Sequence, residues 1–118
     1  MDRVLADCRA RLGFDLLSHT WNAVVICALA DGELRPRDLR VAIGSISSKV
    51  LTETLRRLEG YALVERRAVA GSPPGVAYAL TALGRTLLEP IEALGRWSAE
   101  CGDAFAAAQR WDEEDTSA

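Results

Sequence analysis

The segment SSKVLTETLRRLEG, residues 47–60, predicts an amphipathic helix with a marked beginning. Ser47 is a good N-cap, because its hydroxyl can accept a hydrogen bond from a first-turn N–H. The apolar face of the helix, residues 48–60, consists of Leu51, Leu55 and Leu58. The outward side is polar and mostly basic; it comprises Lys49, Glu53, Arg56 and Arg57, with Thr52 at its edge.

A shorter helix is expected just upstream of this segment. Pro36 suits a first helical position, and Leu39 and Ile43 would face inward one turn apart. Gly44 opens a three-residue turn before Ser47. Two helices joined by such a turn form the helix-turn-helix pattern, whose second helix presents a polar face to the major groove.

Two helices are expected before this motif. The first spans about residues 4–17 and has a partial apolar stripe. The second, WNAVVICALA at residues 21–30, is apolar on nearly every side, so we expect it to be buried, with Cys27 in the core. Gly32 provides the usual left-handed stop.

The residues after the motif predict a β-hairpin. Residues 63–69 and 76–80 alternate as strands do, and the cluster AGSPPG at 70–75 favours a turn between them. Helix, turn, helix and hairpin is the order of a winged helix. The predicted fold class is therefore α+β, mostly α: a winged helix-turn-helix with a hairpin wing and a long C-terminal helix.

Thr81 is expected to cap that final helix, within which Pro90 should introduce a kink. An apolar seam recurs every three or four residues, at Leu83, Leu87, Ile91, Leu94, Trp97 or Ser98, Cys101 and Phe105. The seam is longer than one small domain needs, so we expect a second copy to cover it and form a homodimer. Residues 1–108 are expected to form a single domain, and the acidic tail at 109–118 is expected to be disordered.

Charge is distributed unevenly along the chain. The net charge of −3 argues against a nucleic-acid partner, but residues 35–85 carry nine basic and four acidic groups. A duplex responds to the local field, because salt screens charges beyond roughly 8–10 Å. The middle of the chain is thus the predicted surface for double-stranded DNA.

Composition excludes several other classes. The three widely spaced cysteines and one histidine give neither a disulfide framework nor a zinc pattern, so no metal or cofactor is expected. No apolar run is long enough to cross a membrane, and the N-terminus lacks a signal-peptide core, which favours the cytoplasm. No catalytic triad, paired carboxylates or phosphate loop is recognisable, so an enzyme is not expected.

The sequence resembles the HxlR-type winged-helix regulators, relatives of the MarR proteins, over about residues 8–97. Cys8 precedes Trp21 by thirteen residues, and GELR at 32–35, ISSKVLT at 46–52 and LVER at 63–66 follow in family order. The most specific match is PPGVAYALTALG at 73–84. The resemblance implies a homodimer that binds a palindromic operator, usually as a repressor, and in some members responds to oxidants or electrophiles through the N-terminal cysteine.

The chain departs from the family pattern at a few positions. It has His19-Thr20 for Gly-Lys, Pro36 for Phe and Ala62 for Gly, while Gly75 and Ala77 replace residues that are often charged in the wing. These changes leave the expected fold intact and weaken the expected wing contacts with phosphate.

The predicted DNA-binding surface combines two kinds of residue. Lys49 is suited to guanine or a phosphate, and Glu53 to the amino group of cytosine. The arginines and the wing tip are suited to phosphates. The complete predicted set is Arg35, Arg37, Ser47, Ser48, Lys49, Thr52, Glu53, Arg56, Arg66, Arg67, Gly71 and Ser72.

Two regulatory sites are also considered. Cys8 lies near Arg9 and Arg11, which favour a reactive thiolate, and Cys101 is a candidate partner for a disulfide. A small-molecule effector pocket is considered from the aromatic residues Phe14, His19, Trp21 and Trp97. The alternative function is a dimeric winged-helix module that binds a protein and does not regulate DNA.

Overall fold

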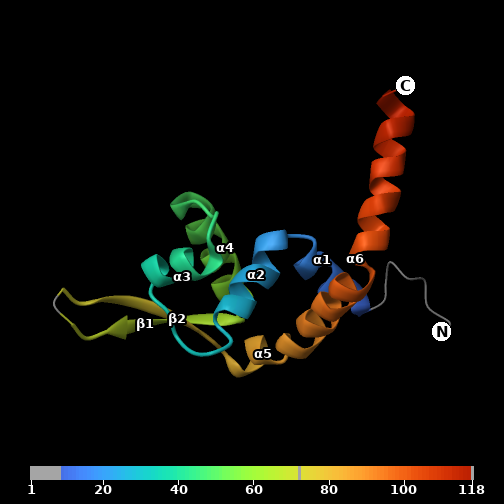
Figure 1. Ribbon diagram of the computed structural model, residues 1–118. Helices are drawn as coiled ribbons and strands as arrows, with labels where there is room; N and C mark the ends of the chain where they lie inside the picture. Colours follow the sequence, from blue (N-terminus) through green and yellow to red (C-terminus); the bar gives the residue numbers. More distant parts are fainter. Residues whose placement is uncertain (1–8, 72, 118) are drawn as a thin grey trace. The chain divides into compact units, whose positions relative to one another are not determined.

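The computed structural model describes residues 9–71 and 73–117 and contains helices and one β-hairpin (Figure 1). Its helices are α1 (Ala10–Leu17), α2 (Thr20–Ala28), α3 (Pro36–Ile43), α4 (Ser48–Gly60), α5 (Ala82–Arg85) and α6 (Leu88–Ser117). The strands are β1 (Val64–Val69) and β2 (Gly75–Leu80). Among the described residues, those up to Leu88 form one compact unit and those from Glu89 onward form another. The winged helix-turn-helix prediction is confirmed, although the part of the first predicted helix before residue 9 lies outside the described residues.

The core of the first unit is assembled from the faces that periodicity predicts. Leu39 of α3 is fully buried, and so are Val25 and Ile26 of α2. Further buried side chains come from α4 and the hairpin: Leu51, Leu55, Leu58, Leu63, Val64, Ala77, Ala79 and Leu80. Burial of these aliphatic groups holds the motif helices together, each contributing roughly 1.5–3 kcal/mol for a fully buried large side chain.

The hairpin follows α4 directly and extends beyond α3 (Figure 1). β1 and β2 pair antiparallel, with Arg66 opposite Tyr78 and Arg67 opposite Ala77. On the other edge of β2, Leu34 and Tyr78 exchange two backbone hydrogen bonds of 2.9 and 3.0 Å. The segment before α3 therefore forms a one-residue third strand, which places Arg35 beside the wing.

The predicted single final helix is wrong at its beginning. Thr81 does act as an N-cap, since its Oγ1 accepts a 3.0 Å hydrogen bond from the Gly84 N–H, but the helix that it caps is the short α5. A new helix, α6, then starts at Leu88. Pro90 has no N–H to donate to the carbonyl four residues earlier, so it occupies the first turn of α6, where no such bond is needed. Pro90 therefore lies near the beginning of a helix and does not kink one.

At its other end α6 continues to Ser117, through the segment expected to be a disordered tail. The sequence AFAAAQ before that segment is rich in strong helix formers, which favours continuation of the helix. None of the described helices combines the length and hydrophobicity that a membrane crossing needs.

Candidate nucleic-acid interface

The outward face of α4 is the centre of the candidate interface. All five side chains predicted to read DNA on this helix are solvent-exposed: Ser48, Lys49, Thr52, Glu53 and Arg56. Ser47 has a structural role as well, because its hydroxyl accepts a 3.1 Å hydrogen bond from the Val50 N–H. The helix thus starts where the sequence predicts, and the cap fixes the first turn that would enter a groove.

Arg57, placed by periodicity on the same outward side, is instead half-buried. Its Nη1 donates to Oδ1 of the fully buried Asn22 at 3.0 Å. The Asn22 amide in turn donates to the Leu16 carbonyl at 2.9 Å. Arg57 therefore ties α4 to α2 and to the end of α1. Helical spacing alone could not show this, because its acceptor lies 35 residues away.

A shallow hollow of about 210 Å³ separates α3 from the beginning of α4. Arg37 and Arg40 line it from α3, and Ser48 and Thr52 line it from α4. Arg37 was predicted to bind phosphate, whereas Arg40 was missed. The spacing from Arg37 could have indicated Arg40, since residues three apart on a helix share a face. Two guanidinium groups beside the first turn of α4 suit a phosphate anion.

The two wing arginines differ in their surroundings. Arg66 is exposed on β1 and has no acidic contact among those found in the described residues. Arg67 contacts the Glu65 carboxylate, and its Nη1 lies 3.6 Å from Oε2 of Glu33. The pKa of Arg67 is raised, chiefly by the hydrogen bond to Glu65 and next by the negative charge of Glu65. The two carboxylates offset the charge of Arg67, so Arg66 is the better phosphate ligand.

Arg35 lies against the wing because two glycines leave room for it. A Cβ added at Gly71 would come within 3.2 Å of Nη2 of Arg35, and a Cβ at Gly75 within 3.2 Å of Nη1. The guanidinium therefore lies beside the backbone of the hairpin tip. Gly71 is exposed, as a tip contact requires, and Ser72 lies outside the described residues.

Of the two cysteines predicted to sense oxidants, Cys101 lies within the described residues. Cys8 lies outside the described residues, and Cys101 is half-buried on α6. The expectation that Cys27 belongs to the core is wrong, because its side chain is exposed. The opposite side of α2, with Val25 and Ile26, faces the core, so the helix is buried on one side only.

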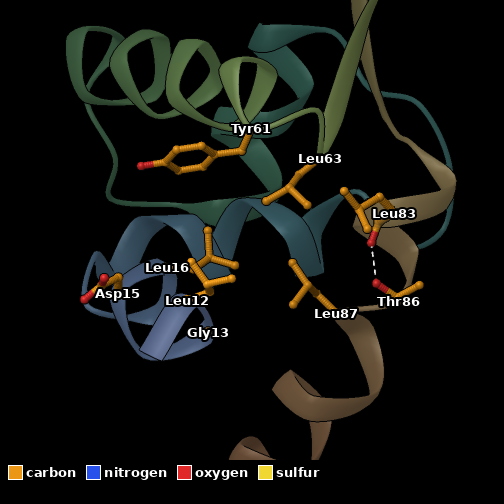
Figure 2. A pocket seen from close by; sticks show the side chains of 9 residues that line it. All are labelled: Leu12, Gly13, Asp15, Leu16, Tyr61, Leu63, Leu83, Thr86 and Leu87. Carbon is orange, nitrogen blue, oxygen red and sulfur yellow. Dashed lines mark hydrogen bonds between the residues drawn. The ribbon is translucent and has the colours of Figure 1, made fainter. Parts of the chain in front are cut away.

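The predicted aromatic residues do not line the main pocket of the first unit. Phe14 and His19 are exposed, Trp21 is half-buried, and Trp97 on α6 makes an edge-on contact with Phe105. The pocket is formed mainly by aliphatic residues instead (Figure 2). Its lining residues are Leu12, Gly13, Asp15, Leu16, Tyr61, Leu63, Leu83, Thr86 and Leu87.

Residues 16–105 match the family model described as HxlR-like helix-turn-helix. The chain belongs to the HxlR-like family. YtfH of Escherichia coli, an uncharacterized HTH-type transcriptional regulator, is 36% identical over 90 residues, which cover 76% of this chain and 71% of YtfH. The HTH-type transcriptional regulator YodB of Bacillus subtilis is 35% identical over 85 residues, covering 72% of this chain and 76% of YodB.

Solved structures agree with this assignment to the HxlR-like family. Reduced YodB superposes with a TM-score of 0.69 at 34% identity, over 77% of this chain and 90% of YodB. The redox regulator HypR in its reduced form gives a TM-score of 0.77 at 28% identity, over 85% of this chain and 99% of HypR. The chain is therefore a helix-turn-helix transcriptional regulator, and the family consists of regulators rather than enzymes.

Proposed function

We propose that the chain is a repressor that binds a palindromic operator as a homodimer. The observation that carries this proposal is the exposed face of α4, with Arg37 and Arg40 of α3 beside its first turn, Arg35 against the tip of the hairpin and Arg66 exposed on β1. In a symmetric dimer two such faces would enter successive major grooves, roughly 34–36 Å apart.

The test begins with selection of bound duplexes from a random library, followed by titration of the selected duplex at several salt concentrations. We expect a palindromic consensus and an affinity that falls steeply with salt. Lys49→Ala and Arg56→Ala should weaken binding. A lost phosphate contact lowers the salt slope by about 1, whereas a lost base contact relaxes the consensus at one position.

Arg85→Ala is the matched control, because this exposed arginine lies on α5, away from α3 and α4 (Figure 1). It should leave the affinity and the salt slope unchanged. If no duplex is enriched, or if the α4 variants bind as tightly as the wild type, DNA binding through α4 is refuted. The protein-interaction module would then be the better assignment.

A thiol switch is a second part of the proposal. The structures of YodB after diamide treatment and of HypR in its oxidised form motivate it. Diamide would take two electrons and two protons from two thiols. The two sulfur atoms would then join as a disulfide between Cys8 of one protomer and Cys101 of the partner subunit.

Non-reducing electrophoresis and DNA titration after diamide treatment test the switch. Cys8→Ser and Cys101→Ser should each abolish the cross-link and the release of DNA. Cys27→Ser is the control, since the exposed Cys27 is a competing target outside the proposed pair. Release of DNA from the Cys8→Ser variant would exclude Cys8 as the sensor.

A further inference from the structure

The tip of the hairpin carries no charge of its own. Residues 70–76 read AGSPPGV, so neither the turn nor the strand ends beside it contribute an acidic or a basic side chain. Arg67, on β1, lies closer to the base of the hairpin, and the Glu65 and Glu33 carboxylates offset its charge. A contact between the tip and DNA therefore needs a cation from elsewhere in the chain.

Arg35 brings a cation to the tip from outside the hairpin. Its Nη2 lies 3.2 Å from the position of a Cβ on Gly71, and its Nη1 lies 3.2 Å from the position of a Cβ on Gly75. One guanidinium group thus lies against both arms of the hairpin. Neither glycine has a positive φ, so the backbone conformation does not require glycine at these two positions. The missing side chains instead leave the space that Arg35 occupies.

The backbone of Arg35 is held on both sides. Leu34 exchanges two backbone hydrogen bonds with Tyr78 of β2, and the Arg35 carbonyl accepts a 2.9 Å hydrogen bond from the Leu39 N–H. The side chain of Arg35 is half-buried. Within residues 9–71 and 73–117, no carboxylate pairs with its guanidinium and no acceptor takes a hydrogen bond from it. That part of the chain therefore leaves the positive charge of Arg35 uncompensated.

The length of the hairpin matches the distance between neighbouring grooves of a duplex. Each strand has six residues. At about 3.4 Å per residue, the hairpin is roughly 20 Å long. It extends beyond α3 (Figure 1). Where α4 occupies a major groove, the next minor groove lies half a helical turn away, or roughly 17 Å. The tip can therefore carry Arg35 to that minor groove.

We propose that Arg35 enters the minor groove beside each half-site and makes the protein prefer A·T base pairs there. A-tracts have a narrow minor groove, whose enhanced negative potential attracts arginine. A G·C pair instead places the amino group of guanine in this groove, and that donor opposes the guanidinium donors. The inference rests on the proposed DNA-binding function and adds a source of specificity outside the α4 contacts.

The first test repeats the selection of bound duplexes with the full-length wild type and with Arg35→Ala. We expect the wild type to enrich A·T pairs about half a helical turn from the bases that α4 reads. Arg35→Ala should lose this enrichment and keep the rest of the consensus, because its α4 is unchanged.

A titration with three duplexes then tests the minor groove directly. The enriched positions are made A·T, G·C or inosine·C pairs, and inosine lacks the minor-groove amino group of guanine but keeps its major-groove acceptors. The wild type should bind the G·C duplex about tenfold more weakly than the other two. Arg35→Ala should bind all three duplexes alike. Weak binding of the inosine duplex by the wild type would overturn the minor-groove contact.

Gly75→Val keeps the charge of Arg35 but fills the space of its guanidinium, so it should also remove the A·T preference. Ala68→Val is the matched control. Ala68 pairs with Val76, and neighbours along a strand point to opposite faces, so the added bulk lies on the face away from Arg35. A preference that survives in Arg35→Ala or Gly75→Val, or that disappears in Ala68→Val, would overturn the proposal.

The selection also separates the two levels of the proposal. A wild-type consensus without an A·T preference at these positions would overturn the role of Arg35 and leave DNA binding through α4 intact. Enrichment of no duplex at all would refute the proposed function and the role of Arg35 together.

Discussion

Ala62 holds a backbone conformation that ordinarily favours glycine, with φ at +60°. The turn around it is fixed by hydrogen bonds: its N–H donates to the Glu59 carbonyl at 3.0 Å, and its carbonyl accepts from Thr81 Oγ1 at 2.7 Å. This turn leads from α4 to β1 and needs the left-handed conformation whatever the residue. Alanine at this position therefore costs about 1 kcal/mol that glycine would not.

Ala62→Gly should raise the free energy of unfolding by about 0.5 kcal/mol, because relief of this strain exceeds the added flexibility of the unfolded chain. Chemical denaturation monitored by circular dichroism measures the change. The control is Ala82→Gly, at the beginning of α5, where φ is ordinary and glycine should lower the stability. A decrease for Ala62→Gly would contradict the strain argument.

Gly84 is constrained by space rather than by its dihedral angles. A Cβ there would lie 2.1 Å from the Leu63 carbonyl oxygen, which is backbone and cannot move aside without disturbing the hairpin. Gly84→Ala should therefore cost about 2–3 kcal/mol, measured as a lower denaturation midpoint. Gly95→Ala on α6, where no atom lies within 4 Å, should instead be neutral or slightly stabilising. Similar effects for the two variants would refute the steric account.

At the scale of elements, local signals predicted the motif well. Pro36, Gly44 and Ser47 are helix start and stop signals with a physical cause. Helices α3 and α4 begin and end at the predicted residues. Side-chain positions that depend on long-range contacts could not be predicted from local sequence. Arg57 turns inward because a buried amide accepts from it, and the Arg67–Glu33 pair joins segments that only the folded hairpin brings together.

Ser47→Ala removes the cap of α4 and should lower the stability by about 1 kcal/mol, because the Val50 N–H loses its acceptor. Ser47→Asp is the informative comparison, since a carboxylate also caps a helix and complements its dipole. We expect Ser47→Asp to keep the stability measured by thermal denaturation but to weaken DNA binding through repulsion of phosphates. Equal stability of Ser47→Ala and the wild type would show that the cap is dispensable.

At the scale of the whole molecule, α6 presents large apolar side chains that a lone protomer leaves half-exposed: Leu94, Trp97 and Phe105 are 50%, 48% and 53% exposed. The spacing of four and three residues along the seam is the one that lets two helices pack side by side. Local periodicity predicted the part of this seam that lies on α6, but it did not predict the break that leaves Leu83 and Leu87 outside α6. The pocket around Tyr61 was not predicted, because its walls come from segments distant in sequence.

Leu94→Glu should dissociate the proposed homodimer, because a carboxylate would be buried there without a partner. We expect the dimer Kd, measured by analytical ultracentrifugation, to rise on the order of 100-fold, with a parallel loss of operator affinity. Arg96→Glu, on the same helix but outside the seam, is the control and should leave the dimer intact. Dimers that persist at dilute concentration in Leu94→Glu would place the interface elsewhere.

The close approach of Gly84 to the Leu63 carbonyl also determines where the C-terminal helix can be exchanged. Residues 81–84 are seated on the base of the hairpin through the Thr81 bonds to Ala62 and Leu63 as well as through this contact. A chimaera that transplants the C-terminal helix of another regulator should therefore be spliced at Leu88, where α6 begins. A splice upstream of Gly84 would also replace residues that hold the base of the wing in place.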